Sequence, residues 1–251
     1  MQIGRFKDQE KTFYGIINGD IVTALEGGPY GQIKPINQFY RKDQLQALAP
    51  CMPTKAVCVG LNYRDHAEEL GYPVPEEPVL FIKPSTTVIG PGEDIIYPSS
   101  SNQVDYEAEL AVVIGRTCRN IGVGEAREYI LGYTCGNDVT ARDLQNKDGQ
   151  WTRAKSFDTF LPLGPYIITD LDPGNLTVDL RLNGETRQSS ATNNLIFDVF
   201  SLVSFISGVM TLNPGDVVMT GTPGGIGPIA EGDRIEVEIQ GIGVLENGVS
   251  R

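Results

Sequence analysis

The chain alternates short β-runs with tight turns, and this pattern limits the folds available to it. Apolar and polar residues alternate in "KTFYGIINGDIVTAL" around Asn18-Gly19 and again in "LTVDLRLNGETRQ" around Asn183-Gly184. Asn-Gly between two alternating runs is a strong signal for a β-hairpin. The 29 glycines and 16 prolines of the 251 residues stand mostly between such runs, where they favour turns. These features predict a mainly β protein with numerous tight turns.

Helical patterns are fewer than strand patterns. Further β-runs occupy residues 56–60, 78–84, 108–115, 215–221 and 233–249. Helical periodicity is confined to residues 64–70, 123–130 and 194–208, and Gly208 is a plausible stop for the last of these. We therefore expect an α+β, mainly β fold, a mixed β-sandwich or roll with a few covering helices.

The sequence also indicates a division near residue 50. Residues 41–55, "RKDQLQALAPCMPTK", resemble a polar helix followed by a proline-containing connection. We expect residues 1–50 to form a small β-rich appendage and residues 51–251 to form the main domain.

Charge and composition exclude several functions and suggest a compartment. Lys and Arg total 20 against 32 Asp and Glu, a net charge of -12, which argues against binding nucleic acid or anionic lipid. The four cysteines show no CxxC spacing, and the first residues lack the basic-then-apolar pattern of a signal peptide. No apolar run approaches the ~18 residues of a membrane span. We expect a cytoplasmic protein that contacts neither nucleic acid nor membrane.

Two glutamates begin the most apolar β-run, "DYEAELAVVIG". Glu107 and Glu109 point to the same side of a strand, with Cα atoms roughly 6.6 Å apart. Asp138, after the β-run in "GYTCGNDVTARDLQ", is a candidate third carboxylate. Such oxygens are ligands that Mg²⁺ or Mn²⁺ prefers. From these residues alone, a solvated acidic face, with Asp138 as a turn residue or helix N-cap, is the commoner alternative.

The one histidine is the only side chain with an ordinary pKa near neutrality. His66 lies at the start of the short helical pattern, and Glu69 is three residues later on the same helix face. A carboxylate beside an imidazole favours a base that activates water. The alternative is a solvated pair on a surface helix. A helix this short is marginal alone, so it suits a mobile lid.

Taken together and in order, the motifs resemble the fumarylacetoacetate hydrolase family, in its short-chain branch. The resemblance covers about residues 55–247 and rests on "GLNYRDHAEE", "LFIKPSTTVIGPGEDI", "VDYEAELAVVIG", "GYTCGNDVTARDLQ", "WTRAKSFDTFLPLGP", "LNGETRQ", "LIFDVFSLVSFIS" and "LNPGDVVMTGTPGGIG". It implies the β-fold of that family's C-terminal domain, over residues 51–251, and commonly a homodimer.

The resemblance also implies a site. It implies that Glu107, Glu109 and Asp138 bind Mg²⁺ or Mn²⁺, and that His66 and Glu69 fold over the site and activate water. Lys155 matches a lysine that contacts substrate oxygens. Further positions that match the polar lining of the pocket are Lys83, Gln145 and Thr222. "TGTPGGIG" lacks the phosphate-binding patterns of nucleotide sites, and we expect its amides and Thr222 to approach a substrate carboxylate.

The implied activity is metal-dependent hydrolysis of a carbon–carbon bond in a small anionic 2-oxo acid, a 2,4-dioxo acid of the acylpyruvate type. The same site in relatives serves oxaloacetate decarboxylation or tautomerisation, or isomerisation or decarboxylation of 2-hydroxyhepta-2,4-diene-1,7-dioate. A third possibility, from another class, is a non-catalytic metal-binding β-protein. The presence of the complete set of site residues argues against it.

Overall fold

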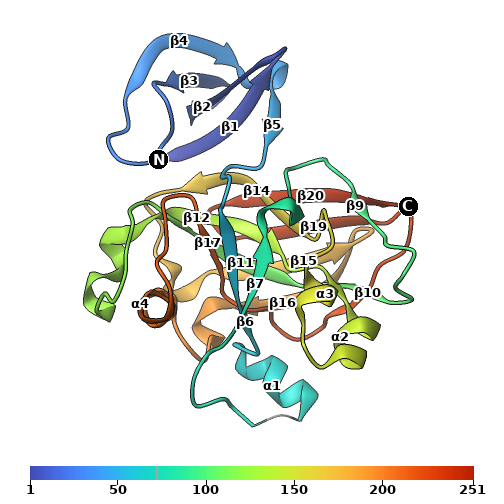
Figure 1. Ribbon diagram of the computed structural model, residues 1–251. Helices are drawn as coiled ribbons and strands as arrows, with labels where there is room; N and C mark the ends of the chain where they lie inside the picture. The colour runs from blue at the N-terminus through green and yellow to red at the C-terminus, as the bar shows by residue number, and fades with distance from the viewer. Residues whose placement is uncertain (72) are drawn as a thin grey trace.

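The computed structural model describes residues 1–71 and 73–251 and confirms a mainly β fold (Figure 1). The largest sheet has twelve strands, and Figure 1 shows it running from the N-terminal lobe into the body of the molecule. Its main path is, in order, β4 (Pro35–Arg41), β3 (Ile21–Leu25), β2 (Lys11–Asn18), β1 (Gln2–Asp8), β14 (Leu161–Ile168), β12 (Ile130–Asn137), β11 (Ala108–Ile114), β17 (Val217–Met219), β6 (Lys55–Gly60) and β7 (Val79–Pro84). Off this path, β5 (Gln46–Leu48) pairs with β1, and β8 (Val88–Ile89) pairs with β14.

A second sheet packs against the body of the first. Its five strands are, in order, β16 (Glu185–Ala191), β15 (Thr177–Leu182), β19 (Arg234–Ile239), β20 (Gly243–Ser250) and β9 (Ile95–Ile96). A three-stranded sheet adds β13 (Thr140–Ala141), β10 (Val104–Tyr106) and β18 (Gly227–Pro228). The large and five-stranded sheets share one apolar core.

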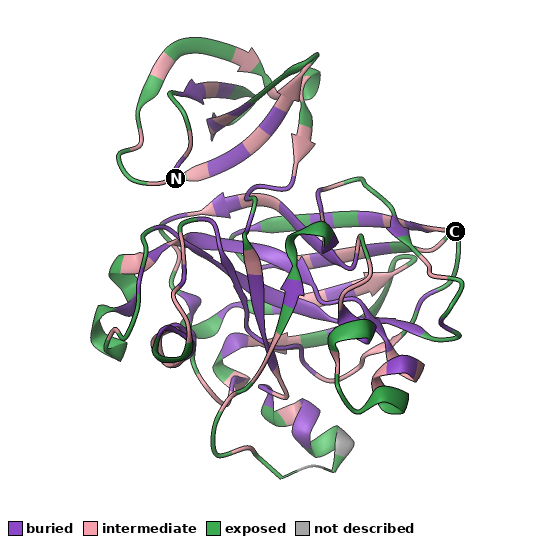
Figure 2. Ribbon diagram, in the orientation of Figure 1, coloured by how far each residue is buried: buried purple, intermediate pink, exposed green. Residues whose placement is uncertain are grey.

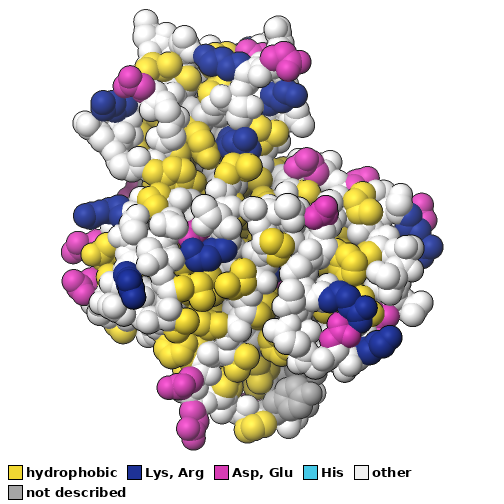
Figure 3. All heavy atoms as spheres, in the orientation of Figure 1, with side chains coloured by type: hydrophobic (Ala, Val, Ile, Leu, Met, Phe, Trp, Pro, Cys, Tyr) yellow, Lys and Arg dark blue, Asp and Glu magenta, His cyan; other side chains and the backbone are white. Residues whose placement is uncertain are grey.

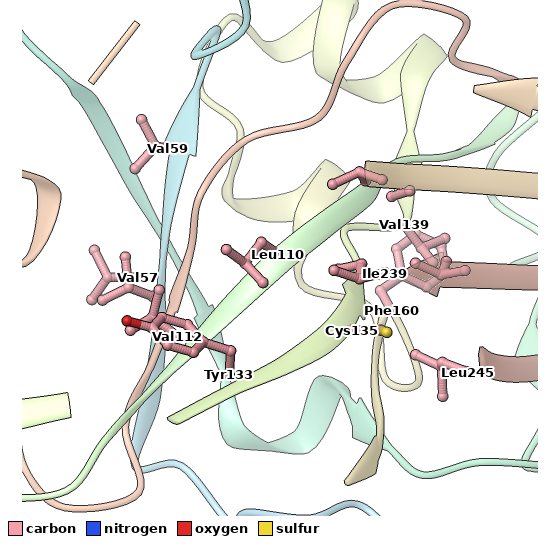
Figure 4. Packing of buried hydrophobic residues seen from close by; sticks show 14 of the residues in the cluster. Val57, Val59, Leu110, Val112, Tyr133, Cys135, Val139, Phe160, Ile239 and Leu245 are labelled. Carbon is pink, nitrogen blue, oxygen red and sulfur yellow. The ribbon is translucent and has the colours of Figure 1, made fainter. Parts of the chain in front are cut away.

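Strand β11 is buried on both faces (Figure 2). Leu110 and Val112 point into the core shared with the five-stranded sheet, and Ala111 and Val113 point into a second cluster on the other side. Figure 4 shows the first of these clusters gathered around β11, with Tyr133 on the neighbouring strand. A strand that is buried on both faces has apolar residues at consecutive positions. This explains the uninterrupted apolar stretch "LAVVI" at residues 110–114. The glutamates therefore begin a strand at the centre of the protein.

Short helices cover the edges of the sheets. The α-helices are α1 (Arg64–Leu70), α2 (Arg142–Asp148), α3 (Thr152–Lys155) and α4 (Val199–Val209). The 3₁₀ turns are η1 (Lys42–Gln44), η2 (Ser85–Thr87), η3 (Val123–Tyr129), η4 (Pro173–Asn175) and η5 (Thr192–Asn194). In Figure 1, α1, α2 and α3 lie at the end of the molecule away from the N-terminal lobe.

The helix predictions were partly right. The prediction over residues 64–70 is confirmed, whereas the pattern at 123–130 forms 3₁₀ turns. Helix α4 begins only at Val199, because the Asp198 carboxylate accepts a hydrogen bond from Ser201 N at 2.9 Å and caps the helix there. The helix continues one residue past Gly208, to Val209.

The polar helix predicted within residues 41–55 is wrong. Between Arg41, which ends β4, and Lys55, which begins β6, the segment contains the turn η1 and the strand β5. Strand β5 pairs with β1 through Arg5 opposite Leu48. Tertiary pairing outweighs helical propensity here. Strands β1 to β5 all lie within residues 1–50 and enclose an apolar cluster of their own. Strand β1 also pairs with β14, through Gln2 opposite Ile168, so the large sheet is continuous across this point.

Both predicted hairpins form. Asn183 and Gly184 have φ angles of 53° and 81° and join β15 to β16 in a two-residue turn, as expected for Asn-Gly. In the first hairpin Asn18 still pairs with Ile21, so Gly19 and Asp20 form the turn, one residue later than predicted. Among residues 1–71 and 73–251, no helix is long and apolar enough to cross a membrane.

The junction of β6 and β17 depends on a buried carboxylate, Asp216. It accepts hydrogen bonds from Thr54 N at 3.0 Å, Thr54 Oγ1 at 2.7 Å and Asn213 N at 2.9 Å, and an ion pair from Lys55 Nζ. Burial alone would raise the pKa of Asp216, but Lys55 and the other donors outweigh it and lower the pKa below 3.8. The carboxylate therefore stabilises the fold above pH 4, and this contribution is lost as the pH falls through the lowered pKa.

We predict that Asp216→Asn lowers the free energy of unfolding by about 2 kcal/mol at pH 7, because charge-assisted hydrogen bonds are lost. The difference from the unmodified protein should shrink towards pH 3, because the unfolded state, in which the pKa of Asp216 is higher, binds the proton first and is favoured. Urea denaturation of both proteins at the two pH values measures this. An equal difference at pH 7 and pH 3 would contradict the assignment.

Candidate active site

Three carboxylates converge at the beginning of β11. Glu107 and Glu109 are 6% and 1% exposed, and Asp138 is 1% exposed. One oxygen of each lies within 4.8 Å of the others. The antiparallel pairing of β11 with β12 causes this, because Ala108 stands opposite Asn137 and Asp138 N donates to Glu107 O at 2.8 Å. The solvated-face alternative is therefore wrong.

Buried or partly buried cations contact two of the three carboxylates. Lys155, at the end of α3, donates to Glu107 Oε2 at 2.8 Å and Asp138 Oδ2 at 2.7 Å. Arg142, the first residue of α2, forms an ion pair with Glu107 Oε1 and donates to Asp105 Oδ2 at 2.8 Å. These contacts lower the pKa of Glu107 to about 2, although burial alone would raise it. Asp138 and Glu107 likewise raise the pKa of Lys155 against the effect of burial.

Glu109 differs, because the described residues provide no cation partner for it. Its carboxylate accepts one hydrogen bond, from Gly221 N at 2.7 Å. Burial, followed by the nearby Asp138 and Glu107, raises the pKa of Glu109 well above 4.5. A divalent cation would supply the missing positive charge, and three carboxylates match the oxygen preference of Mg²⁺ and Mn²⁺. The donor set thus fits such an ion.

The local charge count supports the same fit. Within the described chain the connected cluster contains four carboxylates and three cations, so a full complement of ionised groups leaves a net negative charge. The carboxylates are Asp105, Glu107, Glu109 and Asp138, and the cations are Lys83, Arg142 and Lys155.

Helix α1 supplies the histidine. His66 Nδ1 lies 3.1 Å from Glu69 Oε2, and the side chains of His66 and Glu69 are 8% and 46% exposed. Gly225 N donates to the same Glu69 oxygen at 3.1 Å. The predicted pair is therefore formed, and the histidine is buried rather than solvated.

These groups share one cavity of about 390 Å³. Its wall combines apolar and aromatic side chains with the carboxylates and the histidine. The lining residues are Val59, Gly60, Leu61, His66, Phe81, Glu107, Glu109, Asp138, Arg142, Gln145, Asn146, Trp151, Lys155, Thr222 and Ile226. A concave site with several converging polar groups is typical of a small-molecule pocket.

Of the predicted pocket residues, Gln145 and Thr222 line the cavity, whereas Lys83 is fully buried and not part of its lining. Lys83 instead forms an ion pair with Asp138 Oδ1 and donates to Val139 O at 3.0 Å. It therefore neutralises a site carboxylate without facing the cavity. Sequence reasoning missed Arg142. Its place four residues after Asp138, at the start of a helix, was the available signal.

The glycine-rich loop, residues 220–227, uses two of its amides for carboxylates within the protein, and an approach of its other amides to a substrate carboxylate stays a prediction. Two of its amides, Gly221 N and Gly225 N, donate to Glu109 and Glu69. These amides therefore bind carboxylates of the protein itself. Thr222 and Ile226 are the residues of this loop that line the cavity.

Comparison with known families identifies the class of protein. The family described as fumarylacetoacetate (FAA) hydrolase C-terminal matches residues 55–250, and the family described as Rv2993c-like, N-terminal, matches residues 1–50. The chain belongs to the fumarylacetoacetate hydrolase family, as the motifs indicated.

Particular relatives show which branch it resembles. Protein Rv2993c of Mycobacterium tuberculosis is 44% identical, covering 100% of this chain and 98% of the relative. The mitochondrial oxaloacetate tautomerase Fahd2a of Rattus norvegicus is 43% identical, covering 83% of this chain and 70% of the relative. The crystal structure of 5-carboxymethyl-2-hydroxymuconate delta-isomerase from Mycobacterium smegmatis superposes with a TM-score of 0.95, at 44% identity and full coverage of both chains. These relatives match the short-chain branch.

We predict opposite effects from two matched substitutions in the carboxylate cluster. Glu107→Gln should destabilise the metal-free protein by about 3 kcal/mol, because the buried Lys155 and the partly buried Arg142 lose the charged partner that they share. Glu109→Gln should leave metal-free stability unchanged or higher, since it removes an uncompensated buried charge while retaining an acceptor for Gly221 N.

Thermal unfolding with and without Mn²⁺ measures both effects. Saturating Mn²⁺ should raise the Tm of the unmodified protein, because a ligand that binds the folded state stabilises it. It should have little effect on Glu109→Gln. Retention of the full Mn²⁺-dependent shift by this variant would exclude Glu109 as a ligand.

Proposed function

We propose that this protein is a divalent-cation-dependent enzyme acting on a small anionic 2-oxo acid, with Glu107, Glu109 and Asp138 holding Mg²⁺ or Mn²⁺. The observation that carries the proposal is that three buried carboxylates and His66, whose partner is Glu69, line one cavity. When bound, the cation stabilises negative charge that develops on substrate oxygens. The remaining chemistry falls to side chains of the protein.

The histidine is the proton-transfer group in this proposal. In this proposal His66 Nδ1–H donates a hydrogen bond to the Glu69 carboxylate, which leaves Nε2 as the basic nitrogen. Two hydrogen bonds of the Lys155 ammonium go to Glu107 and Asp138. Its third N–H has no hydrogen-bond acceptor among the described residues, so in this proposal it orients a substrate oxygen. A non-catalytic metal-binding protein would not require a buried histidine, paired with a glutamate, beside the carboxylates.

As the net reaction we propose hydrolysis of a 2,4-dioxo acid of the acylpyruvate type. His66 Nε2 removes a proton from water as the oxygen adds to the distal carbonyl carbon. The bond between that carbon and C3 then breaks, and its electron pair forms the enolate of the 2-oxo acid. The protonated histidine returns the proton to C3. The products are a carboxylic acid and a 2-oxo acid such as pyruvate.

A second candidate is keto–enol tautomerisation or double-bond isomerisation, favoured by the likeness to the rat oxaloacetate tautomerase and the Mycobacterium smegmatis isomerase. Here His66 removes a proton from one substrate atom and returns it to another, and no water enters. Oxaloacetate decarboxylation is a variant that releases CO₂ and forms the same kind of enolate. All these reactions pass through an enolate, so the cavity suits each of them.

Proton NMR separates these reactions. Metal-stripped protein, with and without restored Mg²⁺, receives acetylpyruvate in one tube and oxaloacetate in another. We expect Mg²⁺-dependent acetate and pyruvate from acetylpyruvate. A faster approach to keto–enol equilibrium of oxaloacetate without new products would establish a tautomerase, and pyruvate from oxaloacetate alone would establish a decarboxylase. Absence of every one of these changes would refute hydrolysis, tautomerisation and decarboxylation of these substrates, and would leave double-bond isomerisation or a non-catalytic protein.

Two adjacent glutamates provide a matched test of the His–Glu pair. Glu69→Gln should lower kcat by about 10- to 100-fold and His66→Ala by about 10²- to 10⁴-fold, the usual contribution of general acid–base catalysis. Glu68 is the neighbouring exposed residue with no side-chain hydrogen bond within the described chain, so Glu68→Gln is the control and should retain activity. Equal activity of all three variants would remove the pair from the mechanism.

A further inference from the structure

Strand β16 contacts the site from outside the cavity through two polar side chains. Gln188 and Ser190 are two residues apart, so they project to the same side of the strand. Strand β16 is the edge of its sheet and pairs only with β15 in the described part of the chain. Neither residue lines the cavity. Both nevertheless bond to the elements that carry the site residues.

Gln188 links the carboxylate strand to the glycine-rich loop. Its side chain is buried, with 1% of the residue exposed. The Oε1 atom accepts a hydrogen bond from Ala108 N at 2.9 Å, the amide between Glu107 and Glu109. The Nε2 group donates to Thr222 Oγ1 and Pro223 O, both at 2.8 Å. One amide group thus spans two walls of the site.

Ser190 links the same strand to helix α1. Its hydroxyl donates to Asp65 Oδ2 at 2.5 Å and accepts from Asn194 Nδ2 at 2.9 Å. The other oxygen of Asp65, Oδ1, accepts from His66 N at 2.7 Å. Asp65 is therefore held from both sides, and the next residue along the chain is the histidine.

The loop itself lies against the backbone of β16. At Gly225, whose φ is +89°, a Cβ atom would lie 2.3 Å from Arg187 O, so only glycine permits this approach. Gly225 N in turn donates to Glu69 at 3.1 Å. Strand β16, the loop and helix α1 thus form one connected set of contacts.

We propose that Gln188 and Ser190 are positioning residues. Gln188 fixes the strand that carries the metal ligands and Ser190 fixes the helix that carries His66 and Glu69, so that both elements contact the same substrate. This inference rests on the proposed function, in which both groups act together. Helix α1 has seven residues and is marginal by itself. Its docking therefore depends on side-chain contacts such as Ser190 with Asp65. The carboxylate strand is fixed separately, through Gln188.

Substitutions at Ser190 and Gln188 should affect kcat and the Kd for Mn²⁺ differently. Ser190→Ala removes the bond to Asp65 and should lower kcat about tenfold while leaving the Kd for Mn²⁺ unchanged, because no bond to the carboxylate strand is lost. Gln188→Met, of similar volume, should weaken Mn²⁺ binding about tenfold and also lower kcat. Ser190→Thr keeps a hydroxyl and should restore most of the activity.

The test uses the full chain with four variants: Ser190→Ala, Ser190→Thr, Gln188→Met and the control Ser189→Ala, whose side chain is exposed on the opposite side of β16. Calorimetric titration with Mn²⁺ alone gives the metal Kd. Hydrogen exchange over residues 64–71 reports the docking of α1. Turnover of acetylpyruvate and oxaloacetate gives kcat and KM.

We expect faster exchange over residues 64–71 in Ser190→Ala, and unchanged exchange in Ser189→Ala. Unchanged exchange and kcat in Ser190→Ala, or equal losses of Mn²⁺ affinity in Ser190→Ala and Gln188→Met, would overturn the positioning roles. If the unmodified protein turns over neither compound, the proposed function fails. The exchange and Mn²⁺ measurements then still decide whether the two residues position their elements.

Discussion

Repulsion among buried carboxylates is the constraint on which the site depends. Pairing of β11 with β12 brings Glu107, Glu109 and Asp138 together at the centre of the protein, where water cannot screen them. Buried like charges persist only when other groups compensate them. Lys155 and Arg142, from two later helices, compensate part of this charge and must pack here for the fold to close. Glu109, for which the described residues provide no cation, marks where a metal ion fits.

The site combines side chains from rigid core strands with side chains from a weakly held helix. The carboxylates sit on central strands buried on both faces. The histidine sits on a short covering helix, fastened at Asp65 and Glu69 by a strand and a loop from distant parts of the chain. Elements with few apolar contacts open more readily than core strands. Such a helix suits a substrate that must enter and leave.

Much of the site was predictable from the sequence because its signals are local. Glu107 and Glu109 on one side of a strand follow from the two-residue period, and His66 beside Glu69 follows from helix spacing. The ordered motifs identified the family and with it Asp138 and Lys155. Lys83 was predicted to line the pocket but is not among its lining residues. A lysine at the end of a strand gives no indication in the sequence of whether it faces a cavity or pairs with a buried carboxylate such as Asp138. The helix within residues 41–55 failed because pairing with β1 decided that segment.

The sequence by itself determined the strand-rich class, the hairpins, the family and the identity of the charged groups. Alternation, turn residues and motif order are properties of neighbouring residues, so they are visible along the chain. Only the tertiary structure decided which charges neutralise one another and what holds the histidine helix in place. Arg142 with Glu107, Gln188 with Ala108 and Ser190 with Asp65 join residues 35, 80 and 125 positions apart. Such contacts arise from the packing of whole elements, which no local pattern specifies.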